Sequence, residues 1–123
     1  MTDGDTVRVE LASGREERVR YIGIDTPEPT GGECFADEAT EANARLVAGR
    51  QVRLVPGEEE RDRYGRLLAY VYAGDVLVNA RLLREGYAEP LVVRPNDRFA
   101  ERFAALARDA RREGRGLWAS CAS

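Results

Sequence analysis

The 123-residue chain contains no histidine and no lysine, so all 19 of its basic side chains are arginines. Without histidine it has no Ser-His-Asp or Cys-His catalytic arrangement and no His-ligated metal site. Without lysine it can form neither a Schiff base nor a phosphate-binding loop of the P-loop type. Acid–base chemistry is therefore left to carboxylates, tyrosines and water, and oxygen ligation of a hard metal ion stays open.

Long apolar runs are also missing, and the mean hydropathy is −0.49. A transmembrane helix needs about 20 predominantly apolar residues in succession, so we expect no membrane span. The 22 acidic side chains outnumber the basic ones and leave a net charge of −3. This balance argues weakly against nonspecific nucleic-acid binding without excluding a local basic groove. The length fits one domain, which we place at residues 1–123.

The order of periodic segments indicates about five strands with one helix inserted and two more near the C-terminus. Alternating residues predict strands over 5–11 and 17–24, and further strands at 51–55, 67–72 and 76–78. Helical spacing predicts a helix from Phe35 that stops at Gly49, one over 79–85, and one opened by 95–97 that ends at Gly114. Residues 88–93 are expected to be extended, and the acidic run 58–60 to be a solvated loop. We therefore expect an α+β, mainly β fold: a five-stranded OB-fold barrel with three helices.

Three short polar segments lie where predicted strands give way to loops: residues 3–6, 20–28 and 62–66. Each alone is explained by a turn or a helix cap. Together they suggest a site, because Asp5 and Asp25 lie near the ends of adjacent predicted strands and could converge on one cation. Oxygen ligands without histidine or cysteine favour Ca²⁺ or Mg²⁺ over zinc.

The same segments supply the other groups that phosphodiester hydrolysis needs. Glu28 follows on the loop and could activate a water molecule. Arg20 and Arg66 could present guanidinium groups to a phosphate. A metal ion and two arginines would stabilise the charge that develops on the phosphorane oxygens.

These segments resemble the signatures of the staphylococcal nuclease (thermonuclease) family. They read Asp-Gly-Asp-Thr at 3–6, Arg20 with Asp-Thr-Pro-Glu at 25–28, and Asp-Arg-Tyr-Gly-Arg at 62–66. The likeness continues in register at 69–72, 78–83, 86–88 and 116–118, so that it covers nearly the whole chain. The resemblance implies an OB-fold barrel with three helices and Ca²⁺-dependent cleavage of DNA and RNA. The products implied are 5′-hydroxyl and 3′-phosphate ends.

The resemblance also implies roles for individual residues. Asp5 and Asp25 would bind calcium together with the backbone carbonyl of Thr26, and Glu28 would be the general base. The remaining matches are the two phosphate-binding arginines, Arg20 and Arg66, and two residues that contact the nucleotide beyond the scissile phosphate, Arg63 and Tyr64.

The two cysteines alone are compatible with reduced thiols in the cytoplasm or with a disulfide in an exported protein. The resemblance favours a disulfide between Cys34 and Cys121, as in secreted bacterial members of the family. We therefore expect a secreted or cell-envelope protein whose leader is not part of this chain, because Met1-Thr2 runs straight into Asp3 without a signal-peptide pattern. Reduced cysteines would instead indicate the cytoplasm.

The sequence departs from the family in three places. Only two residues precede Asp3, so we expect the barrel to be clipped at its first strand. Leu91-Val92-Val93 stands where the best-known member carries tyrosines that stack on the base, which predicts weaker nucleotide binding and altered base preference. The loop 29–33 carries no basic residue, which predicts weaker phosphate affinity.

Two other functions stay open at this point. One is a non-catalytic OB-fold module that binds nucleic acid or protein, since fold does not determine function. The other is a domain that binds calcium for stability alone, which would leave Arg20 and Arg66 without a role. The intact set of carboxylates and arginines favours the enzyme. Nothing in the sequence requires more than a monomer.

Overall fold

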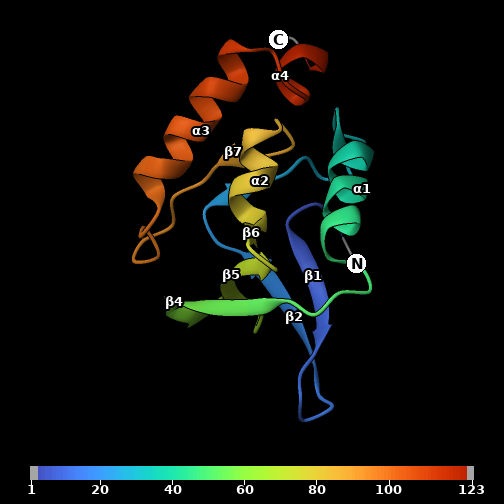
Figure 1. Ribbon diagram of the computed structural model, residues 1–123, viewed down its shortest axis with the longest axis vertical. Coiled ribbons are helices and arrows are strands. Elements are labelled where there is room, and N and C mark those ends of the chain that lie inside the picture. The colour runs from blue at the N-terminus through green and yellow to red at the C-terminus, as the bar shows by residue number, and fades with distance from the viewer. Residues whose placement is uncertain (1–2, 122–123) are drawn as a thin grey trace.

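The computed structural model describes residues 3–121 and shows a mixed α/β fold. The main sheet occupies one end of the molecule and the helices gather at the other (Figure 1). The strands are β1 (Thr6–Glu10), β2 (Glu16–Tyr21), β3 (Ile24–Asp25), β4 (Arg53–Arg61), β5 (Leu67–Ala73), β6 (Val76–Leu77) and β7 (Glu89–Pro90). The helices are α1 (Ala36–Val47), α2 (Val78–Arg84), α3 (Ala100–Arg112) and α4 (Leu117–Ser120). The predicted fold class is confirmed, and α4 is an additional short helix.

The main sheet has five strands in the order β1-β2-β5-β4, with β6 paired to β5. The strands β1 and β2 form an antiparallel hairpin, β2 runs parallel to β5, and β4 runs antiparallel to β5. Within residues 3–121 no pairing joins β1 to β4, so the OB-like sheet is open between these edges. A groove of about 1040 Å³ lies there, lined by β1 and the segment that leads into β4.

Apolar side chains from the sheet and the helices meet in one buried cluster. Aromatic rings join the two layers, since Tyr70 of β5 lies edge-on to Phe103 of α3 with ring centres 6.3 Å apart. Each fully buried side chain of this size stabilises the fold by about 1.5–3 kcal/mol. The large apolar side chains that are almost fully enclosed are Val19, Tyr21, Ile24, Val71, Val78, Leu82, Leu83 and Phe103.

The acidic run 58–60 corrects one prediction, because it lies in β4 and not in a loop. Its side chains are exposed, as expected. The pairing of β4 with β5 skips between Pro56 and Arg61, which indicates a bulge. Asn96 supplies the missing bonds: its Oδ1 accepts the N–H of Glu59 at 2.8 Å, and its Nδ2 donates to the Glu59 carbonyl at 2.9 Å. The partner lies 37 residues away, so no local pattern predicts it.

The C-terminal segment docks on the end of α2 through two glycines. The N–H of Leu117 donates to the carbonyl of Gly86 at 2.8 Å. Both Gly86 (φ 82°) and Gly116 (φ 55°) have a positive φ, which favours glycine. A Cβ on Gly86 would collide with the carbonyl of Arg115, and a Cβ on Gly116 would collide with the carbonyl of Gly86. This contact brings α4 to the helical end of the molecule (Figure 1). None of the helices within residues 3–121 has the length and apolar character needed to cross a membrane.

Candidate active site

The buried carboxylate of Asp5 is the centre of the candidate site. Asp5 lies just before β1 and is only 2% exposed. Its Oδ2 accepts the N–H of Thr26 at 2.9 Å, and its Oδ1 accepts the hydroxyl of Thr6 at 3.3 Å. The Asp5 N–H donates to Oδ1 of Asp3 at 3.0 Å. A buried carboxylate needs such compensation, and these bonds fix its orientation.

Arg20 brings positive charge to the same place from β2. Its Nη1 donates to the carbonyls of Tyr21 at 2.7 Å and Ile24 at 2.9 Å, which fixes the plane of the guanidinium group. Its Nη2 lies 3.4 Å from Oδ2 of Asp5 and 3.6 Å from Oδ1 of Asp25. The arginine therefore lies between the two aspartates that the sequence predicts to converge.

Asp25 and Thr26 differ sharply in their exposure. Asp25 ends β3, which pairs with β7, and 56% of its side-chain surface is open to solvent. Thr26 is buried, and its Oγ1 has no hydrogen-bond partner in the part of the chain that the structure describes. A buried polar atom without a partner is costly, and this hydroxyl lies close to Gly4, where a Cβ would come within 2.8 Å of it.

Negative charge accumulates around these residues. Burial, followed by a hydrogen bond and charge repulsion from Asp5, raises the pKa of Asp3 to about 6. The pKa values of Asp25 and Glu28 are also raised, first by partial burial and then by the charge of Asp5. Arg20 opposes the shifts of Asp25 and Glu28 but does not cancel them. The site thus carries more negative than positive charge.

The donor atoms fit a hard divalent cation. Asp5 and Asp25 offer carboxylate oxygens that lie close to the same nitrogen of Arg20, and the neighbouring Thr26 adds a backbone carbonyl oxygen. Oxygen-only ligands suit Ca²⁺ and Mg²⁺, and a cation would offset the excess negative charge. Across residues 3–121 no three His, Cys, Asp or Glu side chains are arranged to hold a metal by themselves. A cation here would therefore need backbone oxygen and water in addition to the two aspartates.

In the described part of the chain, Arg66 forms an ion pair with Asp62 and not, as Arg20 does, with Asp5 or Asp25. Its Nε donates to Oδ2 of Asp62 at 2.7 Å and its N–H donates to Oδ1 at 2.9 Å. Although burial raises the pKa of Asp62, these bonds to Arg66 lower it overall. Arg66 lies two residues before Leu68, which is opposite Arg20 in the parallel pairing of β2 and β5. No ion pair among the described residues joins Arg66 to Asp5 or Asp25.

Arg63 and Tyr64 form an exposed platform at the turn between β4 and β5. Tyr64 is 61% exposed. The guanidinium carbon of Arg63 lies 5.1 Å from the centre of the Tyr64 ring, and Nη2 of Arg63 donates to the Tyr64 hydroxyl at 3.0 Å. Arg18 donates to the Tyr64 carbonyl at 3.3 Å and supports the turn from β2. The platform offers an aromatic face and a cation to a ligand.

Three apolar residues, Leu91, Val92 and Val93, lie on the surface, in the segment where the sequence predicts no base-stacking ring. They are 41%, 48% and 57% exposed. The Leu91 N–H donates to the carbonyl of Gly23 at 2.9 Å, which ties this segment to the end of β2. An exposed apolar edge here offers contact area without an aromatic ring.

Two supporting residues were not predicted from the sequence. Glu33 accepts the N–H of Glu28 at 2.9 Å. Asn43 accepts the hydroxyl of Tyr21 at 2.6 Å and donates to the carbonyl of Asp3 at 3.0 Å. Asn43 is a polar residue beside the apolar stripe of α1, which is a signal that could have identified it. Glu33 lies in a glycine-rich loop that gives no such signal.

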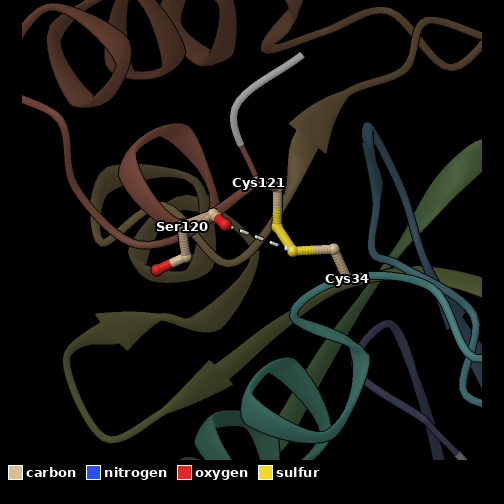
Figure 2. The surroundings of a disulfide bond; sticks show 3 residues. All are labelled: Cys34, Ser120 and Cys121. Atoms are coloured by element: carbon tan, nitrogen blue, oxygen red, sulfur yellow. Dashed lines mark hydrogen bonds between the residues drawn. A yellow bond between two sulfur atoms is a disulfide. The ribbon is translucent and has the colours of Figure 1, made fainter.

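Cys34 and Cys121 are joined by a disulfide that connects the start of α1 to the end of α4 (Figure 2). The Sγ of Cys34 lies 3.6 Å from the carbonyl oxygen of Ser120. Both cysteines line a cleft of about 610 Å³ together with Asp25 and Thr26. The disulfide is therefore one wall of a cleft that reaches the candidate metal-binding residues.

Comparison with known proteins places the chain in a family. Residues 18–120 match the family model described as staphylococcal nuclease homologue. The chain is 35% identical over 122 residues to a thermonuclease of Staphylococcus hyicus, covering 96% of this chain and 72% of the relative. It is 34% identical over 120 residues to a thermonuclease of Staphylococcus intermedius, covering 94% and 71%. Endonuclease YncB of Bacillus subtilis is 34% identical over 122 residues, covering 94% and 57%.

The names of these relatives support a nuclease function. The extent of the match, over most of the chain and over more than two thirds of both thermonucleases, is sufficient to assign the family. The chain belongs to the staphylococcal nuclease homologue family.

Proposed function

We propose that this protein is a calcium-dependent nuclease that hydrolyses the phosphodiester bonds of DNA and RNA to 3′-phosphate and 5′-hydroxyl ends. The observation that carries the proposal is the convergence of Asp5 and Asp25 on Arg20, whose Nη2 lies 3.4 Å from Oδ2 of Asp5 and 3.6 Å from Oδ1 of Asp25. Relatives named thermonuclease and endonuclease support the same reaction class.

The proposed metal ligands are the carboxylates of Asp5 and Asp25 and the carbonyl of Thr26. When bound there, Ca²⁺ would supply positive charge to the phosphate oxygens. Asp5 is fixed by its bonds to Thr26 and Thr6, whereas Asp25 opens to solvent. A buried and an accessible carboxylate together provide a rigid and an adjustable ligand.

Glu28 is the proposed general base. Its carboxylate is exposed and has a raised pKa, caused first by partial burial and then by Asp5 and Asp25. In the proposed step it takes a proton from a water molecule whose oxygen attacks phosphorus. The bond from phosphorus to the 5′-oxygen breaks, and that oxygen leaves with the electron pair and takes a proton from solvent. General bases typically contribute about 10²–10⁴-fold to such rates.

Arg20 and Arg66 are the proposed anion-stabilising groups. Arg20 is oriented by two backbone carbonyls and Arg66 by Asp62. Guanidinium groups held in place beforehand stabilise developing charge without reorganising. Arg63 and Tyr64 are proposed to contact the adjoining nucleotide through the exposed platform. The disulfide favours a secreted or cell-envelope location, since disulfides persist in oxidising compartments.

The test is cleavage of single-stranded DNA in calcium, with a chelator and with Glu28→Gln in parallel. We expect calcium-dependent cleavage that the chelator abolishes and that Glu28→Gln lowers by about 10²–10⁴-fold. Glu58→Gln is the matched control, because Glu58 is an exposed carboxylate on β4, outside the site. The products should block a polymerase until a phosphatase removes their 3′-phosphate.

The two alternative functions predict different results in the same experiment. A non-catalytic OB-fold module would bind DNA in the presence of the chelator and would leave the DNA uncleaved in the presence of calcium. A domain that binds calcium only for stability would unfold at a higher temperature with calcium and cleave nothing. Full activity in the chelator would contradict the calcium dependence.

A further inference from the structure

The loop that carries Glu28 is closed on itself by two hydrogen bonds. The N–H of Glu28 donates to Oε1 of Glu33 at 2.9 Å, and the N–H of Glu33 donates to the carbonyl of Glu28 at 3.3 Å. Inside the loop the N–H of Gly32 donates to the carbonyl of Pro29 at 3.0 Å. The Glu33 side chain therefore joins the first residue of the loop to the last.

The far end of this loop is covalently anchored. Cys34 follows Glu33 and forms the disulfide with Cys121 (Figure 2). The N–H of Cys121 in turn donates to the carbonyl of Leu117 at 2.8 Å, and Leu117 is bonded to Gly86 at the end of α2. Glu33 is thus held between the start of α1 and the docked C-terminal helix.

Glu28 has no comparable support of its own. Its side chain is exposed, and no hydrogen bond or ion pair holds its carboxylate among residues 3–121. The placement of this carboxylate therefore depends on where the backbone of residue 28 is held. Among residues 3–121, the bond from its N–H to Glu33 is the one hydrogen bond that a side chain makes to that backbone, and a charged acceptor makes it stronger than a neutral bond.

We propose that Glu33 is a positioning residue for Glu28, and that the Cys34–Cys121 disulfide is the anchor through which it acts. The inference rests on the proposed function, in which Glu28 is the general base. In this proposal Glu33 acts through the backbone that carries the base, because its carboxylate accepts the N–H of Glu28. A displacement of about 1 Å at a reacting group can lower a rate by about 10²-fold, so loss of the bond should appear in kcat.

Two substitutions separate position from charge. Glu33→Gln and Glu33→Ala both remove the negative charge, but only glutamine keeps an oxygen that accepts the Glu28 N–H. We expect Glu33→Ala to lower kcat by about 10–100-fold with KM changed by less than about threefold, and Glu33→Gln to stay within about threefold of the parent. An equal loss of kcat in both variants would show that the charge of Glu33, and not its hydrogen bond, supports the activity. Normal kcat in Glu33→Ala would show that Glu33 has no role. Either result overturns the proposal.

A readout without catalysis tests the bond directly. We expect amide hydrogen exchange at the Glu28 N–H to speed up in Glu33→Ala and to remain slow in Glu33→Gln. Unchanged protection in Glu33→Ala overturns the proposal. This measurement also separates the two hypotheses, because it stands even if Glu28→Gln is fully active and Glu28 is not the base.

The anchor has its own variant. The double variant Cys34→Ser/Cys121→Ser, studied well below its unfolding temperature, should show faster exchange at the Glu28 N–H and a kcat lowered in the same range as Glu33→Ala. Glu33→Ala added to that double variant should then lower kcat by a smaller factor than it does in the parent, because the disulfide and Glu33 act on the same loop. Unchanged kcat and exchange in the double variant would overturn the role of the disulfide.

Discussion

At the scale of single residues, Gly4 shows how little space separates the parts of the site. A Cβ at this position would lie 2.8 Å from Oγ1 of Thr26 and 2.9 Å from Cβ of Ala39. We expect Gly4→Ala to lower the free energy of unfolding by about 1–3 kcal/mol, because overpacking forces neighbours apart. It should also lower calcium-dependent cleavage, since Thr26 donates to Asp5.

Gly31→Ala is the matched control for this prediction. The nearest atoms to a Cβ at residue 31 lie at 3.8 and 4.0 Å, which is ordinary contact. Its unfolding free energy should stay within about 0.5 kcal/mol of the parent in urea titrations. Equal destabilisation of the two variants would mean that the fit around Gly4 is not the cause.

Polar residues at the ends of strands can be selected as site candidates from the sequence, whereas contacts that depend on the closure of a loop cannot. The sequence suggests that Asp5 and Asp25 converge on a cation, and the structure places both beside Arg20, while the roles of all three stay predictions. Arg66 was expected beside the phosphate with Arg20, and the structure shows it held by Asp62. Glu33 was missed because its bond to Glu28 depends on a loop without periodicity.

At the scale of elements, Asn79 joins α2 to the sheet. This fully buried residue accepts the N–H of Val71 at 2.9 Å and donates to the carbonyl of Ile22 at 2.8 Å. Asn79→Ala would leave both groups buried without partners, at about 1–3 kcal/mol each. We therefore expect a loss of about 2–5 kcal/mol in the free energy of unfolding, measured by urea titration followed by circular dichroism.

Asn79→Asp sharpens this prediction. Aspartate keeps an acceptor for the N–H of Val71 but has no donor for Ile22, and its charge would be buried. The loss should equal or exceed that of Asn79→Ala at neutral pH. A variant as stable as the parent would show that the bond to Ile22 contributes little.

Elements with strong periodicity were predicted well, and those defined by distant partners were not. The sequence predicts a strand at 67–72 and a helix at 79–85, close to the observed β5 and α2. By contrast, β4 extends through the acidic run because Asn96 supplies backbone bonds from far along the chain. The short α4 depends on Gly86 and Gly116, whose contact brings distant segments together.

At the scale of the whole molecule, the two ends are held together in different ways. The sheet is open between β1 and β4, whereas the helical end is closed by the disulfide (Figure 1, Figure 2). The order of the predicted strands and helices indicates an OB-like sheet, but whether its edges pair depends on interactions that a strand pattern does not specify. Because one end lacks a ladder of hydrogen bonds, we expect the molecule to depend strongly on the covalent link at the other.

The disulfide should therefore account for a large part of the stability. Cys34 and Cys121 are 87 residues apart. In the chain-entropy model, closing a loop of this size reduces the entropy of the unfolded chain and so raises its free energy by about 4–5 kcal/mol. We expect Cys34→Ser/Cys121→Ser to lower the free energy of unfolding by about 2–5 kcal/mol in urea. The parent reduced with a thiol should unfold at the same urea concentration as the double variant, because both unfolded chains are unconstrained. A midpoint unchanged from the oxidised parent would mean that the open sheet holds the fold by itself, and the link would then matter only for the loop of Glu28.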